Sequence, residues 1–134
     1  MHQLNELVNV VGYVPDPLAW FDRTLLHVAP MRFGSGLKLR FVETIAAGQP
    51  LVTSNVGAEG LGLGDLADAL VADDAETQAS LALELISNRS RWEEAQRGVL
   101  TVATERFSRR RFRLNLVEAM SRLGVAPPDR LDTL

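Results

Sequence analysis

The sequence contains no cysteine among its 134 residues, which excludes disulfide bonds and thiolate metal sites. Its two histidines, His2 and His27, are too far apart in sequence to indicate a metal cluster. With 14 basic and 17 acidic residues, it also lacks the basic excess of a nucleic-acid-binding protein. No apolar run reaches the ~18 residues of a membrane span, and nothing resembles a signal peptide. We therefore expect a cytoplasmic protein, or one peripheral to the inner face of a membrane, that binds no nucleic acid.

Apolar segments alternate with helical patterns along the chain, which is typical of a parallel sheet covered on both faces. The expected strands span residues 7–14, 25–30, 51–54 and 69–72. The expected helices span residues 16–23, 37–47, 73–86, 90–104 and 108–123. The pattern predicts an α/β fold, a Rossmann-like parallel sheet of about four strands with a helical C-terminal region. We expect one partial domain over residues 1–124 and a polar, proline-containing tail over residues 125–134.

The most informative segment is PMRFGSGLKLRFVETIAAGQP, residues 30–50, in which a Gly-Ser-Gly turn follows a strand and opens a helix. Unpaired N–H groups and the positive end of a helix dipole suit such a turn to a phosphate. Lys38 is expected in the first helical turn, where a cation is disfavoured unless an anion lies beside it. Glu43, further along the helix, is at a distance suited to a sugar hydroxyl. The alternative is a flexible turn with Ser35 as N-cap, a solvated Lys38 and a surface Glu43.

Two further motifs have a functional and a structural interpretation. The loop VGAEGLG, residues 56–62, leaves the carboxyl end of a strand, where open α/β sheets bind ligands. Glu59 in this loop could contact a ligand or cap the turn after it. The run RRRFR, residues 109–113, opens the last helix. We expect a solvated face with apolar residues packed beneath; the alternative is attraction to an anionic membrane surface.

Three stretches resemble the C-terminal domain of GT-B glycosyltransferases of the retaining family-four type. They read VVGYVPD, LLHVAPMRFGSGLKLRFVETIAAGQPLVTSNVGAEGL and LVADDAETQASLALELISN, and the likeness covers residues 8–107. In such enzymes the C-terminal domain holds a nucleotide-sugar donor and the N-terminal domain holds the acceptor. The resemblance implies glycosyl transfer from a nucleoside-diphosphate sugar, with retention and without a metal or other cofactor.

The resemblance assigns roles to particular residues. Ser35, Gly36, Leu37 and Lys38 would bind the donor and its diphosphate, with backbone N–H groups from Gly36 and Leu37. Glu43 would accept hydrogen bonds from the ribose hydroxyls, as the second glutamate of the family's Glu-seven residues-Glu signature. The base pocket would be lined by Gly12, Tyr13 and Val14.

The sequence departs from the family pattern in two respects. Ser35 stands where the first glutamate of the signature usually touches the donor sugar, so the sugar is undefined. The strands that supply the family's Arg and Lys for the diphosphate, and the acceptor domain, have no counterpart in the sequence. We therefore expect a fragment that does not turn over alone, and whose open sheet edge leads to self-association through Leu4, Leu7 and the first strand.

Two alternatives from other classes remain at this point. A non-catalytic interaction module would keep the fold without the chemistry, and the absence of the earlier strands favours it. A sugar-nucleotide epimerase or hydrolase would use the same two-domain architecture.

Overall fold

The computed structural model describes residues 8–126 of the chain, as a mixed α/β structure in which helices predominate. Leu4, Leu7 and residues 127–134, which include most of the expected tail, lie outside the described residues. The helices are the 3-10 helices η1 (Pro17–Arg23) and η2 (Gly64–Leu66) and the α-helices α1 (Leu39–Ala46), α2 (Asn55–Ala58), α3 (Ala67–Leu70), α4 (Ala75–Ser87), α5 (Arg89–Phe107) and α6 (Arg109–Arg122). The strands are β1 (His27–Ala29) and β2 (Leu51–Thr53).

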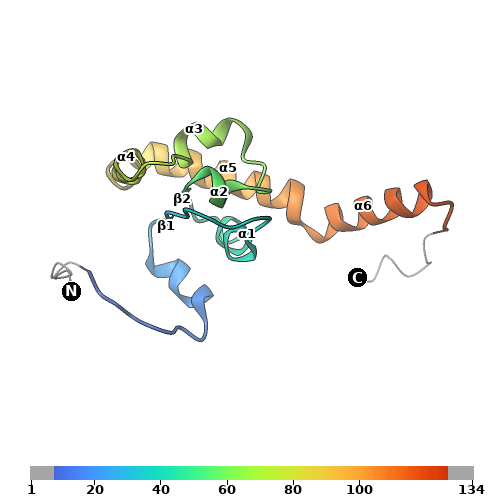
Figure 1. Cartoon of the computed structure of the whole chain (residues 1–134), viewed down its shortest axis with the longest axis horizontal. Coiled ribbons are helices and arrows are strands. Elements are labelled where there is room, and N and C mark those ends of the chain that lie inside the picture. The colour runs from blue at the N-terminus through green and yellow to red at the C-terminus, as the bar shows by residue number, and fades with distance from the viewer. Residues whose placement is uncertain (1–7, 127–134) are drawn as a thin grey trace.

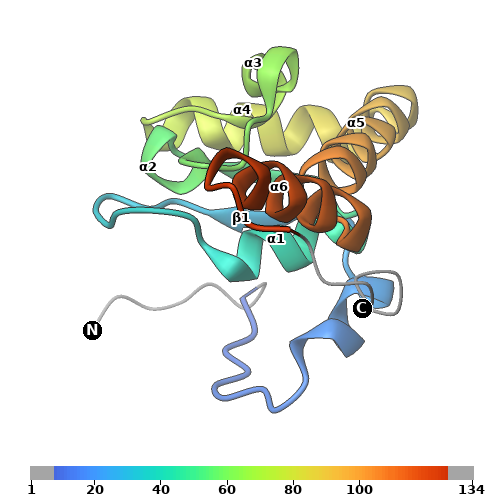
Figure 2. The same cartoon turned by 90° about the vertical axis from the view of Figure 1, so that its right-hand side faces the viewer.

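The two strands form a small parallel sheet with helices on both of its sides. His27, Val28 and Ala29 are in register with Leu51, Val52 and Thr53. α1 lies on one side of the strands, and α2 and α4 lie on the other (Figures 1 and 2). Parallel strands that follow each other in the chain need a crossover connection, and α1 provides it between β1 and β2. This strand–helix–strand unit confirms the predicted α/β class.

The hydrophobic core lies where α1, β2 and the middle of α5 meet. α5 contacts both α1 and α4. Its buried residues are small or β-branched, namely Ala95, Val99 and Ala103, which lets the helices approach closely. The other buried apolar residues are Phe41, Ile45, Leu51, Val52, Leu61, Leu63, Leu70 and Leu85. The core therefore holds α1 and β2 in place, and with them the turn that precedes α1.

Residues 8–126 contain two strands, fewer than the four that were predicted for the chain. The described part of the first expected strand, residues 8–14, is irregular, and it lies apart from the two strands (Figure 1). A β-branched run forms a strand only beside a partner that takes up its backbone hydrogen bonds. In the fourth expected strand, residues up to Leu70 belong to α3, and only Val71 forms a bridge, with Thr53. The prediction was wrong for both segments.

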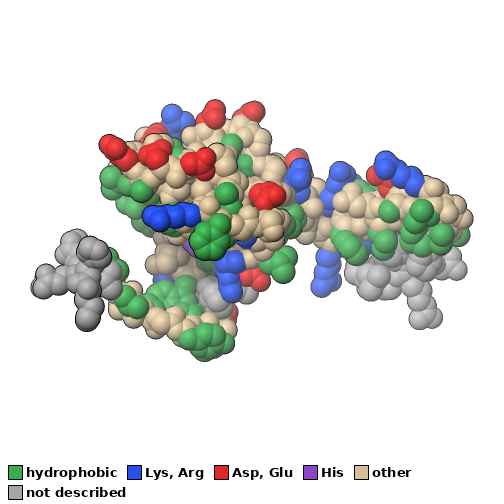
Figure 3. Space-filling view, viewed as in Figure 1, with side chains coloured by type: hydrophobic (Ala, Val, Ile, Leu, Met, Phe, Trp, Pro, Cys, Tyr) green, Lys and Arg blue, Asp and Glu red, His purple; other side chains and the backbone are tan. Residues whose placement is uncertain are grey.

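α6 was predicted in nearly the right place but with the wrong environment. It projects away from the rest of the structure (Figure 1), and none of its residues is buried. Phe112 is 64% exposed, although it was expected to pack beneath the basic run. The helix carries five arginines and one glutamate, whereas acidic side chains gather over α3 and α4 on the face in Figure 3. The sequence pattern of α6 is amphipathic, but the described residues provide no surface to cover its apolar side.

Candidate functional site

Two buried hydroxyl groups hold the chain where β1 leads into the Gly-Ser-Gly turn. Thr53 Oγ1 donates a hydrogen bond to the Ala29 carbonyl (2.7 Å). The neighbouring Ser54 Oγ donates to the Met31 carbonyl (2.6 Å) and accepts from the Gly57 N–H (3.2 Å). Because both hydroxyls are buried and hydrogen-bonded, they fix the exit of β1 against the carboxyl end of β2. The turn therefore starts from a defined place.

One carboxylate oxygen connects the turn to the loop that follows α2. Gly36 adopts a left-handed conformation (φ 71°), which favours glycine, and its N–H donates to Glu59 Oε2 at 2.8 Å. The Lys38 ammonium lies 3.4 Å from the same Oε2 and also donates to the Val56 carbonyl. The Lys38 side chain is only 13% exposed, and that of Glu59 is 53% exposed. A backbone N–H and an ammonium thus converge on one anionic oxygen.

The start of α1 differs from those of four other α-helices and shares with that of α3 the lack of a side-chain cap. α2, α4, α5 and α6 each begin after a residue whose side chain accepts from a backbone N–H, namely Ser54, Asp74, Asn88 and Ser108. α1 begins after Lys38, whose extended conformation makes it the N-cap, with no side-chain cap bond. Lys38 is thus one step before the first helical turn, and Ser35 is not the cap. The positive end of α1 is left open toward the turn.

Glu43 lies in the middle of α1, whereas the turn residues and Lys38 precede the helix. Its carboxylate pairs with Arg40 at 3.2 Å, and both side chains are 49% exposed. Glu43 lines a hollow of about 790 Å³ together with residues of η1, the end of α1 and α5. Among the described residues, no hydrogen bond or ion pair joins Glu43 to Gly36, Lys38 or Glu59. The structure therefore brings three of the predicted site residues together, namely Gly36, Lys38 and Glu59, and pairs Glu43 with Arg40.

The residues predicted for the base pocket are not part of this cluster. Gly12, Tyr13 and Val14 belong to the irregular segment before η1, and the Tyr13 side chain is 89% exposed. Of the remaining turn residues, Ser35 is exposed and Leu37 packs close to Gly60, where an added Cβ would lie 3.3 Å from Leu37 Cδ1. The loop that carries Glu59 thus rests directly on the turn.

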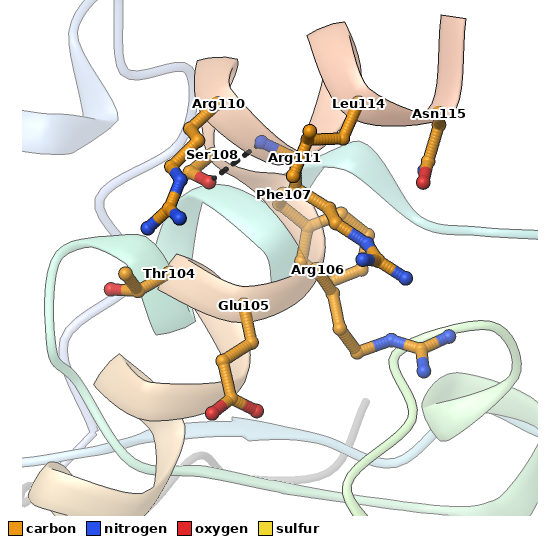
Figure 4. A pocket seen from close by; sticks show the side chains of 9 residues that line it. All are labelled: Thr104, Glu105, Arg106, Phe107, Ser108, Arg110, Arg111, Leu114 and Asn115. Carbon is orange, nitrogen blue, oxygen red and sulfur yellow. Dashed lines mark hydrogen bonds between the residues drawn. The ribbon is translucent and has the colours of Figure 1, made fainter. Parts of the chain in front are cut away.

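Arg106, at the end of α5, is a nearby charged residue that the sequence did not single out. A Cβ added to Gly62 would lie 2.4 Å from Arg106 Cζ, so its guanidinium group lies against the backbone of the loop that follows Glu59. Arg106 also lines a hollow of about 730 Å³ at the junction of α5 and α6, with Arg110 and Arg111 (Figure 4). In this view Arg106 and Arg111 extend to the same side, and Arg110 points away from them. Sequence spacing gives no signal for Arg106, because 44 positions separate it from Gly62.

His27 packs between β1 and α1, where its ring contacts Phe41 and Thr44 of α1. Its Nδ1 lies 2.9 Å from Thr44 Oγ1, and the Thr44 hydroxyl donates to the Arg40 carbonyl. The Thr44 oxygen is therefore the acceptor, and the His27 Nδ1–H is the donor. Burial, and to a lesser extent the positive charge of Arg40, lower the pKa of His27 below its ordinary value. The imidazole is thus a neutral part of the packing between β1 and α1.

Within residues 8–126, no group of three or more His, Asp and Glu side chains is arranged to hold a metal ion. In the same range, no helix is both long and apolar enough to span a membrane.

Comparison with known proteins gives one family. The model for glycosyl transferases of group 1 matches residues 1–88, which include β1, the Gly-Ser-Gly turn, α1, β2 and the Glu59 loop. No curated protein and no solved structure gives a significant match. The matched part ends at the start of α5, so the basic junction of α5 and α6 lies outside it.

Proposed function

Because the chain belongs to the group 1 glycosyl transferases, we propose that it forms the donor-binding part of a GT-B enzyme that transfers a sugar with retention. The donor would be a nucleoside-diphosphate sugar, and the acceptor would be held by a separate N-terminal domain. In the reaction, the bond between the anomeric carbon and the diphosphate oxygen breaks. A bond from that carbon to an acceptor oxygen forms, the diphosphate oxygen keeps the electron pair, and the same departing oxygen takes up the proton of the acceptor hydroxyl.

The observation that supports this proposal is the convergence of the Gly36 N–H and the Lys38 ammonium on one anionic oxygen. The uncapped start of α1 adds a partial positive charge at the same place. A diphosphate leaving group develops negative charge as its bond to the sugar breaks, and preorganised donors of this kind stabilise that charge. Gly36, Leu37 and Lys38 would therefore bind the diphosphate, and Ser35 would face the sugar.

The remaining predicted contacts require rearrangement around the bound donor. Glu43 would exchange its exposed ion pair with Arg40 for the ribose hydroxyls. Such an exchange is inexpensive, because an exposed ion pair contributes at most about 1 kcal/mol. The segment with Gly12, Tyr13 and Val14 would have to close over the base. We propose no metal for the reaction.

A non-catalytic interaction module is a second candidate. Glu59 already neutralises Lys38 and occupies the Gly36 N–H, so the turn is stable without any ligand. In that case the contact would be purely structural, and no nucleotide would compete for it.

Calorimetric titration with UDP and with GDP distinguishes the two candidates. Glu43→Ala should weaken binding of the preferred nucleotide by about tenfold, because a hydrogen-bonded charged group contributes about 1.5 kcal/mol or more. Glu118→Ala is the matched control, since Glu118 also pairs with an arginine on its own helix but lies on α6. A folded chain that binds neither nucleotide would contradict the donor-site proposal and favour the interaction module.

A further inference from the structure

Glu59 reaches the turn from a separate loop. It is the residue after α2, and it lies 23 positions from Gly36 in the sequence. The next residue, Gly60, has φ 80° and packs on Leu37, which brings the loop backbone against the turn. The Glu59 side chain was expected either to touch a ligand or to cap the following turn, and in the structure its carboxylate accepts a hydrogen bond from the Gly36 N–H. Its position is therefore set by tertiary packing.

The Glu59 carboxylate occupies the same partners that a phosphate oxygen would use in the proposed donor site. Its Oε2 accepts from the Gly36 N–H at 2.8 Å and lies 3.4 Å from the Lys38 ammonium. A backbone N–H in this geometry has room for one acceptor, and two anionic oxygens at one position repel each other. A bound diphosphate and the observed position of Glu59 therefore exclude each other.

On these grounds we propose that Glu59 is a built-in competitor of the diphosphate, which must leave Gly36 and Lys38 before the donor binds. The inference rests on the proposed donor site and adds a regulatory residue to it. The two partners differ in freedom: Glu59 is 53% exposed, whereas Lys38 is 13% exposed and is held by the Val56 carbonyl as well. Glu59 can thus move into solvent while Lys38 keeps its place.

The competition also acts as a filter on ligand charge. A ligand with a single negative charge replaces one carboxylate by an equivalent anion and gains little electrostatic energy. A diphosphate brings several negative charges to the same ammonium and helix start. Its favourable electrostatic energy there therefore exceeds the energy lost when the Glu59 carboxylate leaves. The site should therefore discriminate against neutral nucleosides and singly charged anions.

Glu59→Gln tests the competition directly. The amide keeps the size of the side chain and can still accept from the Gly36 N–H, but it removes the negative charge beside Lys38. We expect UDP and GDP to bind the variant about three- to tenfold more tightly than the wild type, while the affinity for uridine and guanosine stays unchanged. Glu118→Gln is the matched control and should change neither the nucleotide affinity nor the nucleoside affinity. If the wild type binds UDP or GDP, unchanged or weaker binding of that nucleotide by Glu59→Gln would overturn the proposal.

Inorganic pyrophosphate, followed through the NMR signal of the Gly36 amide, separates this inference from the proposed function. The signal should shift on titration in both proteins, at lower pyrophosphate concentration in Glu59→Gln. If that holds but neither UDP nor GDP binds, the competition stands and the nucleotide-sugar function fails. If pyrophosphate does not move the Gly36 amide in either protein, Glu59 is not a competitor, whatever the nucleotides do.

Discussion

The starts of α1 and α6 both place cations at the positive end of a helix, yet they are built differently. α1 begins after Lys38, has no side-chain cap, and meets a carboxylate from a distant loop. α6 begins after Ser108, whose Oγ accepts from the Arg111 N–H at 3.2 Å. Its three opening arginines are exposed, and none of the described carboxylates lies within ion-pair distance of them.

The difference teaches what separates a candidate anion site from a solvated basic run. At α6 the Ser108 side chain accepts from one backbone donor, the Arg111 N–H, and the opening arginines are exposed to solvent, where their charges are screened. At α1 the helix start is open, the lysine is nearly buried, and an anionic oxygen is already bound. A cation at a helix start is therefore a sign of anion binding only where the fold buries it and leaves backbone N–H groups available.

The largest expected effect comes from the packing of α2 against β2 and α1, which holds the turn at the start of α1 in place. A Cβ at Gly57 would lie 1.9 Å from Thr53 Oγ1 and 3.1 Å from Phe41 Cε2, both on buried residues. Gly57→Ala should therefore lower the free energy of unfolding by about 3 kcal/mol. Denaturant unfolding measures the loss, and a loss below about 1 kcal/mol would contradict the packing described around the turn.

A pair of glycines tests whether the turn has a role beyond stability. Gly36 and Gly64 both have positive φ (71° and 56°), and nothing lies within 4 Å of an added Cβ at either position. Each substitution by alanine should thus cost about 1–2 kcal/mol of stability through backbone strain alone. Only Gly36→Ala should also weaken nucleotide binding in calorimetry, because it disturbs the N–H that meets the anion. Equal binding by both variants would remove Gly36 from the site.

The cap of α6 provides the opposite test. Ser108→Ala removes the acceptor for the Arg111 N–H and should destabilise α6 by about 1 kcal/mol. Because α6 has no buried residue, the effect should be local, seen as faster hydrogen exchange in α6 with nearly the same global unfolding. Nucleotide affinity should not change. A fall in affinity would mean that α6 contributes to the site.

The smallest expected effect concerns the stability of α4 at acid pH, because its N-cap is the titratable residue Asp74. The Thr77 N–H donates to Asp74 Oδ1 at 2.8 Å and lowers the pKa of Asp74 below its ordinary value. This stabilisation is therefore fully present above the unfolded pKa of about 3.9 and is lost as pH falls through the lower folded pKa. Asp74→Asn keeps a capping side chain but does not titrate. Its unfolding midpoint should depend less on pH below about 4 than that of the wild type; an identical dependence would contradict this account.

The sequence predicted the local elements well where packing and pattern agree. β1, α1 and β2 fall within the expected ranges, and Gly48 ends α1 in the left-handed conformation (φ 74°). The caps of α4 and α6 also follow the residue types that accept hydrogen bonds from a first turn. These features depend on neighbours within a few residues, which is the range in which sequence patterns are informative.

The remaining features depend on contacts between distant segments. Residues 8–14 have the composition of a strand but no described partner, and the apolar side of α6 has no surface to pack on. Likewise, no sequence spacing could reveal that Glu59 binds the Gly36 N–H or that Arg106 lies against Gly62. Lys38, Glu43 and Glu59 were named from the sequence motifs and the other site residues from the resemblance, but the pairing of Glu59 with Gly36 and Lys38 required the fold.

The most direct test compares the two helix starts in one experiment. Titration of the labelled chain with UDP and with GDP, followed through its backbone amide NMR signals, reports both at once. We expect one nucleotide to shift the amide signals of Gly36, Leu37 and Leu39 and to leave those of Arg110 and Arg111 in place. Shifts confined to the start of α6, or none at the start of α1 with either nucleotide, would contradict a diphosphate site at the Gly-Ser-Gly turn.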